Sequence, residues 1–174
     1  MKQGGSGGAN TKTGLCFEGE VDFLSFIKRQ KNYSVKANEI FYKGENVALS
    51  FRKNELYAYL KKRGIDYKKF ISRRLLPDDT IFVIVNNTFF ILEIKFQKIA
   101  GSTDEKLQTC DFKIKQYRKL LSELNVEVKY IYILCDWFKK PEYKDVLDYI
   151  ISIEGCFYYF NYLPLQKLGL PVPN

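Results

Sequence analysis

The most apolar segment of the chain, residues 75–97, contains three side chains that could carry out acid–base or metal chemistry. Asp78 follows Pro77 near its start, and Glu93 and Lys95 interrupt a run of apolar residues near its end. Mg²⁺ prefers oxygen ligands, which two carboxylates and several waters can supply. A lysine beside such an ion can orient the attacking water or accept its proton. These residue types are therefore sufficient for hydrolysis of a phosphodiester.

The pattern of residues 79–96 predicts a hairpin that brings these side chains together. Asn86-Asn87 is the expected two-residue turn, because asparagine tolerates left-handed conformations. Residues whose numbers add up to 173 then lie opposite each other, so Asp78 faces Lys95 and Glu93 shares their face. A three-residue turn would instead direct Asp79 towards Lys95. An E-x-K triplet in a strand more often forms an ion pair on a solvated face, so the hairpin alone does not establish catalysis.

The chain contains no histidine, and this excludes several catalytic classes. Ser-His-Asp and Cys-His nucleophiles, histidine metal sites and nucleases with a histidine base all require that residue. The four cysteines have no C-x-x-C spacing, so we expect them to be reduced and structural and not to bind zinc. Any catalysis must use carboxylates, lysines, tyrosines and a metal held by oxygen.

The positive charge of the chain is concentrated in residues 52–74. The formal net charge is +8, and this stretch contains nine Lys or Arg against Glu55 and Asp66. Such a concentration suits a polyanion such as DNA or RNA, although a solvated helix face is the alternative interpretation. The candidate DNA contacts in this segment are Lys61, Lys62, Arg63, Lys68, Lys69, Arg73 and Arg74.

The remaining sequence predicts alternating helices and strands. Residues 13–31 form an expected amphipathic helix, with Phe17, Val21, Leu24 and Ile27 on one face, Glu20 within that face and Glu18 on its edge. We expect the other elements as short strands in 33–51, a basic helical insert, a helix over 103–124, a strand over 126–138, a helix over 141–154 and a strand over 157–163. The Gly-rich segment 4–14 lacks the spacing of a phosphate-binding loop, so no nucleotide cofactor is expected.

Pro77-Asp78, a spacer of fourteen residues and Glu93-Ile94-Lys95 together resemble the motif of the PD-(D/E)XK nuclease superfamily. The glutamate after Gly14-Leu15-Cys16-Phe17 and the downstream segment GSTDEKLQTCDFKIKQY are similar to parts of type II restriction endonucleases. The resemblance covers roughly residues 8–24 and 70–136. It implies a single α/β domain over residues 1–174, of the α+β mixed-sheet kind. The implied core is restriction-endonuclease-like, of the order αβββαβ, with a mainly helical insert at about 52–74.

The resemblance also implies roles for individual residues. Asp78 and Glu93 would bind Mg²⁺, with Mn²⁺ as a substitute, and the backbone carbonyl of Ile94 would add an oxygen. Lys95 would position or deprotonate the attacking water. Glu18 would support the metal or orient Lys95, and Glu20 competes for this role. Two glutamines could hold phosphates or a catalytic water, namely Gln108 and Gln116.

The expected activity is Mg²⁺-dependent, site-specific cleavage of double-stranded DNA, as by a type II restriction enzyme, leaving 5′-phosphates. Cutting both strands of a palindrome calls for two active sites, so a homodimer is expected. The alternatives are a structure-selective or repair nuclease of the junction-resolvase kind, the cleavage subunit of a heterodimeric restriction enzyme, and a DNA-binding protein on an inactive nuclease scaffold. The apolar runs are too short to span a bilayer and residues 1–14 do not resemble a secretory signal. We therefore expect no membrane partner and a cytoplasmic location.

Overall fold

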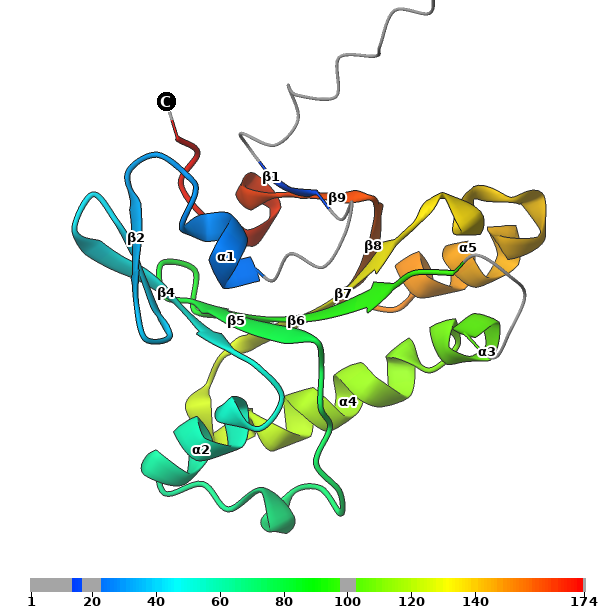
Figure 1. Cartoon of the computed structure of the whole chain (residues 1–174). Helices are drawn as coiled ribbons and strands as arrows, with labels where there is room; N and C mark the ends of the chain where they lie inside the picture. The colour runs from blue at the N-terminus through cyan, green and yellow to red at the C-terminus, as the bar shows by residue number, and fades with distance from the viewer. Residues whose placement is uncertain (1–13, 17–22, 98–102, 174) are drawn as a thin grey trace, which may run out of the picture.

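A seven-stranded mixed sheet forms the centre of the protein (Figure 1). The computed structural model describes residues 14–16, 23–97 and 103–173. The strands lie in the order β2–β3–β4–β5–β6–β7–β8, in which neighbours up to β6 are antiparallel and β6, β7 and β8 are parallel. Their bounds are β2 Tyr33–Lys36, β3 Glu39–Tyr42, β4 Glu45–Phe51, β5 Asp79–Val83, β6 Thr88–Lys95, β7 Glu127–Leu134 and β8 Cys156–Phe160. The mixed α/β class expected from the sequence is confirmed.

Helices and a small second sheet cover the two faces of this sheet (Figure 1). One face packs against α2, α4 and α5, and the other against α1 and the antiparallel pair β1–β9 with η6. The bounds are α1 Phe23–Ile27, α2 Glu55–Lys62, α3 Thr103–Leu107, α4 Cys110–Leu120, α5 Lys144–Ser152, β1 Gly14–Cys16 and β9 Tyr162–Pro164. Short 3₁₀ segments complete the described chain, namely η2 Tyr67–Lys69, η3 Ser122–Leu124, η4 Asp136–Lys139, η5 Pro141–Tyr143 and η6 Leu165–Leu168.

Strand β6 is buried on both faces because it lies near the middle of the sheet. Phe89 and Ile91 belong to the hydrophobic cluster under α4, whereas Phe90 and Leu92 belong to the cluster under α1. This alternation is the period-two pattern of a strand. Because β7 runs parallel to β6, the connection between them must return over one face of the sheet. α4 lies in this connection and packs on that face.

The hairpin β5–β6 has a longer turn than predicted. Val83 pairs with Thr88 and Asp79 with Leu92, so paired residue numbers add up to 171. The turn comprises residues 84–87 and is closed by a hydrogen bond from the Asn87 backbone N–H to the Ile84 carbonyl. The predicted two-residue turn at Asn86-Asn87 and its register are wrong. The physical reason is that a two-residue turn of this kind needs left-handed backbone at both asparagines, whereas Asn87 has a φ of +50° and Asn86 has no positive φ.

The predicted helix over residues 13–31 is wrong as a continuous element. Residues 14–16 form β1, which pairs with β9, and α1 begins only at Phe23 and ends at Ile27. Pairing with a distant strand has overridden the local helical pattern. Residues 17–22 lie outside the described residues, and with them the predicted positions of Phe17, Glu18, Glu20 and Val21.

The basic insert 52–74 is less helical than predicted. Its main helix, α2, has Glu55 in the first turn and Lys61 and Lys62 in the last, which the helix dipole favours. Gly64, with a φ of +77°, follows the end of α2, and η2 is the other helical turn in the insert. Among the described helices, none has the length and hydrophobicity required to cross a membrane.

The cysteine side chains that the structure describes are free thiols, as expected. Cys110 of α4 and Cys156 of β8 are both buried, and Cys135 is half-buried. The side chain of Cys16 lies outside the described part of the chain. Cys110 and Cys156 belong to the hydrophobic cluster between the sheet and α4, and Cys135 packs against it.

Candidate active site

The open end of the β5–β6 hairpin positions the predicted catalytic side chains. Glu93 and Lys95 follow Phe89 and Ile91 at intervals of two along β6, so they share the face of the sheet that carries α4. Asp78 lies directly before β5, and its Oδ2 accepts a hydrogen bond of 2.8 Å from the backbone N–H of Ile94. The carboxylate of Asp78 therefore lies beside the segment that contains Glu93 and Lys95.

The structure distinguishes the two aspartates after Pro77. Asp79 lies on the opposite face, in line with Ile81 and Val83 of the cluster under α1. It is buried, with its Oδ1 3.8 Å from Nε of Arg52, whereas Asp78 is exposed. The register differs from the predicted one by two, which is one full period of a strand, so Asp78 stays on the predicted face.

Two lysines hold the carboxylate of Glu93. Nζ of Lys95 lies 2.5 Å from Oε2, and Nζ of Lys113, from α4, lies 3.2 Å from Oε1. Burial of Glu93 favours its neutral form, but the ammonium groups of Lys95 and Lys113 outweigh burial and hold the pKa of Glu93 below its usual value. Glu93 is therefore ionised at neutral pH although only 9% of the residue is exposed.

Lys113 is a site residue that the sequence analysis missed. It lies four residues before Tyr117, so both side chains share the face of α4 that packs on the sheet. The signal available in the sequence was a lysine within the apolar face of a helix expected to pack behind the motif.

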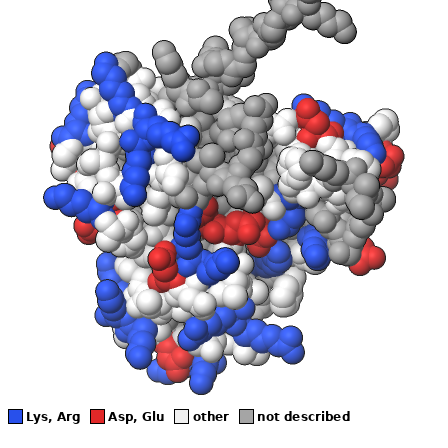
Figure 2. All heavy atoms as spheres, viewed as in Figure 1, with Lys and Arg blue, Asp and Glu red and all other residues white. Residues whose placement is uncertain are grey.

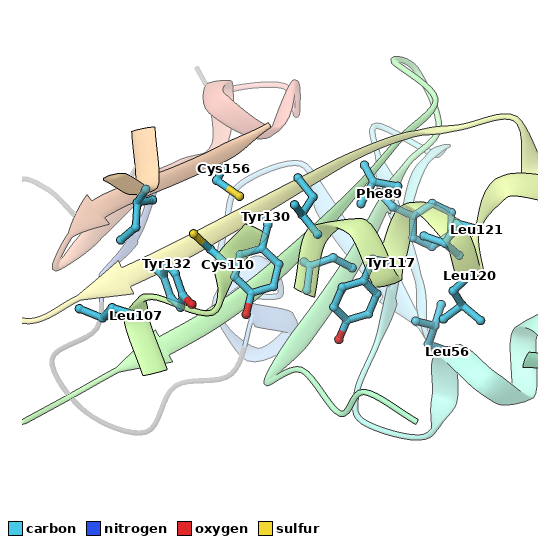
Figure 3. Packing of buried hydrophobic residues seen from close by; sticks show 14 of the residues in the cluster. Leu56, Phe89, Leu107, Cys110, Tyr117, Leu120, Leu121, Tyr130, Tyr132 and Cys156 are labelled. Carbon is cyan, nitrogen blue, oxygen red and sulfur yellow. The ribbon is translucent and has the colours of Figure 1, made fainter. Parts of the chain in front are cut away.

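The buried tyrosines of α4 and β7 form a wall beside the carboxylates. Figure 3 shows the rings of Tyr117, Tyr130 and Tyr132 in the layer between the sheet and α4. Burial, together with the nearby charges of Glu93 and Asp78, raises the pKa of Tyr117 well above its usual value. Tyr117 is therefore a neutral phenol close to both carboxylates, and the site is closed on the α4 side by apolar packing.

Positive charge lies beside and below the acidic side chains of this face (Figure 2). In Figure 2, acidic side chains gather near the middle of the visible face, and Lys and Arg side chains lie beside them and over the lower part of the molecule. The insert forms that lower part (Figure 1). The predicted DNA-contact residues of the insert are all exposed, namely Lys61, Lys62, Arg63, Lys68, Lys69, Arg73 and Arg74. The exposed cations of the insert and the acidic side chains thus lie on the same face of the molecule.

The two glutamines do not join the cluster around Glu93. Gln108 is exposed between α3 and α4, and Gln116 is half-buried on α4. Within the part of the chain that the structure describes, the hydrogen bonds to the side chain of Glu93 come from Lys95 and Lys113.

The donor set fits a hard divalent cation. Asp78, Glu93 and the backbone carbonyl of Ile94 provide only oxygen, which suits Mg²⁺ with several remaining waters. Among residues 23–97 and 105–173, no cluster contains three or more acidic, cysteine or histidine side chains able to hold a metal. The predicted contributions of Glu18 and Glu20 lie outside the described residues, so the described acidic pair of the site is Asp78 and Glu93.

No family model, curated protein or solved structure matches this chain.

Proposed function

We propose that this protein is a Mg²⁺-dependent DNA endonuclease of the PD-(D/E)XK kind. It would cut double-stranded DNA at a specific site, as type II restriction enzymes do, and leave 5′-phosphates. The observation that carries the proposal is the placement of Asp78, Glu93 and Lys95 on one face at the open end of a hairpin. The element order β4–β5–β6–α4–β7, three antiparallel strands and a helical crossover to a parallel fourth, supports a restriction-endonuclease-like core.

Asp78 and Glu93 would hold the metal, with the carbonyl of Ile94 as a further ligand. A bound Mg²⁺ would supply positive charge to a scissile phosphate and to its attacking water. Mn²⁺ also accepts oxygen ligands and would substitute. Glu93 suits this role because it is ionised, and the metal would share its oxygens with the ammonium groups of Lys95 and Lys113.

Lys95 would position the attacking water. An ammonium group has three donors, and the contact with Oε2 of Glu93 uses one of them. The remaining donors can hold a water and a phosphate oxygen side by side, which brings the nucleophile close to phosphorus. Lys113 acts through Glu93, as a positioning residue, because its contact is with Oε1 on the far side of the same carboxylate.

The insert would bind the DNA backbone. Only residues 75–77 separate the last basic residues of the insert from Asp78 in the sequence. A DNA strand bound to the insert would therefore lie near the carboxylates. Cleavage of both strands of a palindromic site would require two copies of this site, in a homodimer.

Incubation of the purified protein with long, unmodified phage DNA tests the proposal. With Mg²⁺ we expect discrete bands on a gel, and with Ca²⁺ we expect intact DNA, because Ca²⁺ takes more ligands at longer distances. A smear would show that the protein cleaves DNA without sequence specificity. Intact DNA with Mg²⁺ and with Mn²⁺, on linear and on four-way-junction substrates alike, would contradict the proposal.

A further inference from the structure

The insert contains a hollow that the proposed cleavage site does not use. Its volume is about 430 Å³, and its walls include Tyr57 of α2, Tyr67 of η2 and the side chain of Arg74. Cavities of roughly 300–1,000 Å³ are typical of sites for small organic ligands. A volume at the lower end of this range holds one nucleotide and not a stack of base pairs.

The walls of the hollow are aromatic and already ordered. The rings of Tyr57 and Tyr67 meet edge to face with their centroids 5.2 Å apart. The guanidinium group of Arg74 lies over both rings, 5.2 Å from the centroid of Tyr57 and 4.9 Å from that of Tyr67. Nη1 of Arg74 also donates to Oδ1 of Asn54, 3.2 Å away. Flat aromatic and guanidinium surfaces are the groups on which unstacked bases pack.

The rim of the hollow carries a net positive charge. Lys61 and Lys68 line it with exposed side chains, and Arg74 adds a third cation. Asp66 is the acidic residue of the lining, and its Oδ1 accepts a hydrogen bond of 3.1 Å from the backbone N–H of Lys68. An apolar floor with cationic groups at the edge matches a base with an attached phosphate.

The hollow is connected to the candidate active site through Tyr57. The hydroxyl of Tyr57 accepts a hydrogen bond of 2.6 Å from the Leu75 N–H and donates one of 2.9 Å to the Leu75 carbonyl. Leu75 lies three residues before Asp78. The ring that lines the hollow therefore also fixes the backbone that delivers the metal-binding carboxylate.

We propose that this hollow takes one unstacked nucleotide of the DNA substrate. The base packs against Tyr67 and Arg74, with the buried ring of Tyr57 beneath them, and Lys61 and Lys68 contact its phosphate. This inference rests on the proposed function, because it assumes that the bound polyanion is DNA. If the hollow takes a nucleotide, the DNA substrate must contain an unstacked nucleotide before binding or acquire one on binding.

Fluorescence anisotropy with Ca²⁺ tests the proposal without cleavage. The probes are a labelled duplex with perfect pairing and the same duplex with one unpaired thymidine. We expect the wild-type protein to bind the duplex with the unpaired thymidine about tenfold more tightly, as base–aromatic stacking allows. Tyr67→Ala and Lys68→Ala should each reduce this preference, and Tyr67→Phe, which keeps the ring, should retain it.

Matched controls separate the hollow from general effects. Lys69→Ala removes the same charge from the next residue, which does not line the hollow, and Tyr149→Ala removes an exposed tyrosine of α5. Both variants should lower affinity for the two probes equally or not at all. Thermal unfolding of each variant establishes that it is folded.

Equal affinity of the wild-type protein for the two probes would overturn the proposal, as would an unchanged preference in folded Tyr67→Ala. If the protein cleaves ordinary duplex DNA with Mg²⁺ but shows no preference for the duplex with the unpaired thymidine, the nucleotide-binding role of the hollow is wrong and the proposed nuclease activity stands. A preference that depends on Tyr67 and Lys68, without cleavage by any metal, would support the hollow and contradict the nuclease.

Discussion

Glu93 shows how a carboxylate can persist inside the most apolar strand of this protein. Burying an unpaired carboxylate is strongly unfavourable, whereas a buried one with charged hydrogen-bond partners is tolerated. Lys95 and Lys113 supply those partners, one to each oxygen. The same two ammonium groups would compete with a cation for Glu93, so removal of either should change both stability and metal dependence.

Glu93→Gln should make the unfolding temperature less sensitive to acid in metal-free buffer. A carboxyl group whose pKa is lowered in the folded chain stabilises the fold above its unfolded pKa, and this contribution is lost as the pH falls through the folded pKa. The ordinary pKa of a glutamate side chain is 4.5, and the ammonium groups of Lys95 and Lys113 hold the pKa of Glu93 below it. We expect the wild-type protein to be more stable by about 1–3 kcal/mol at pH 7 and the difference to shrink below about pH 4. Thermal unfolding of the wild-type protein and of Glu93→Gln, with EDTA and between pH 7 and pH 3, measures this difference in stability. A difference that is constant over this range would contradict the lysine-stabilised carboxylate.

Lys113→Ala should lower the cleavage rate at saturating Mg²⁺ by about tenfold, because Glu93 loses a group that fixes its orientation. The half-saturating Mg²⁺ concentration should also fall, because one competing ammonium group is gone. Titration of the cleavage rate with Mg²⁺ measures both quantities. Lys115→Ala is the matched control, since Lys115 lies on the same helix but pairs with the exposed side of Asp111. An unchanged rate and Mg²⁺ dependence in Lys113→Ala would remove Lys113 from the site.

Among the elements, the hairpin and a helical crossover could be predicted from the sequence because their signals are local. The single helix expected over 103–124 is nevertheless divided into α3, α4 and η3. The apolar run of β6 and the turn-forming asparagines each indicate an element without distant partners. The length of the turn could not be predicted, because the side chains of Asn86 and Asn87 donate to the distant carbonyls of Leu168 and Asn125. The helix over 13–31 failed for the same reason, because β1 exists only through its pairing with β9. The predicted position of Asp78 opposite Lys95 is wrong, since the register places it opposite Glu93, but its predicted face is right, because an error of two in register preserves the face of a strand.

Tyr57→Phe tests whether α2 positions the segment before β5. The ring of Tyr57 remains, but the two hydrogen bonds to the backbone of Leu75 are lost. We expect a loss of about 1–2 kcal/mol in the free energy of unfolding. We also expect a lower cleavage rate, because residues 75–78 are less restrained. Denaturant unfolding and the rate at saturating Mg²⁺ measure the two effects, with Tyr149→Phe on α5 as control. A variant that loses stability but cleaves as fast as the wild type would restrict Tyr57 to a structural role.

At the scale of the whole molecule, an acidic site lies within a basic surface. The insert supplies most of the excess positive charge, and Figure 2 shows that cationic side chains cover its part of the visible face. Fields of this kind attract polyanions and make their binding depend on salt. The location of the charge could be predicted from the sequence, because it lies in one continuous segment.

DNA affinity should therefore fall steeply with salt, and the insert should account for the dependence. Lys62→Ala should lower the slope of log K against log[salt] by about one, as expected for one lost phosphate contact. Lys144→Ala removes an equal charge from α5, where Lys144 pairs with Asp148, and should leave the slope unchanged. Binding isotherms with Ca²⁺ at several salt concentrations provide the slopes. An equal change of slope in both variants would mean that the insert has no special part in DNA binding.

The most direct test of the proposed nuclease compares DNA binding and DNA cleavage in Lys95→Ala, with Lys115→Ala as the matched control. Lys95 contacts Glu93 in the site, whereas Lys115 is exposed on α4. We expect Lys95→Ala to bind DNA with Ca²⁺ about as well as the wild type but to lose at least about a hundredfold in the rate of Mg²⁺-dependent cleavage. The control should retain both. Cleavage by Lys95→Ala at the wild-type rate would contradict the proposed nuclease site.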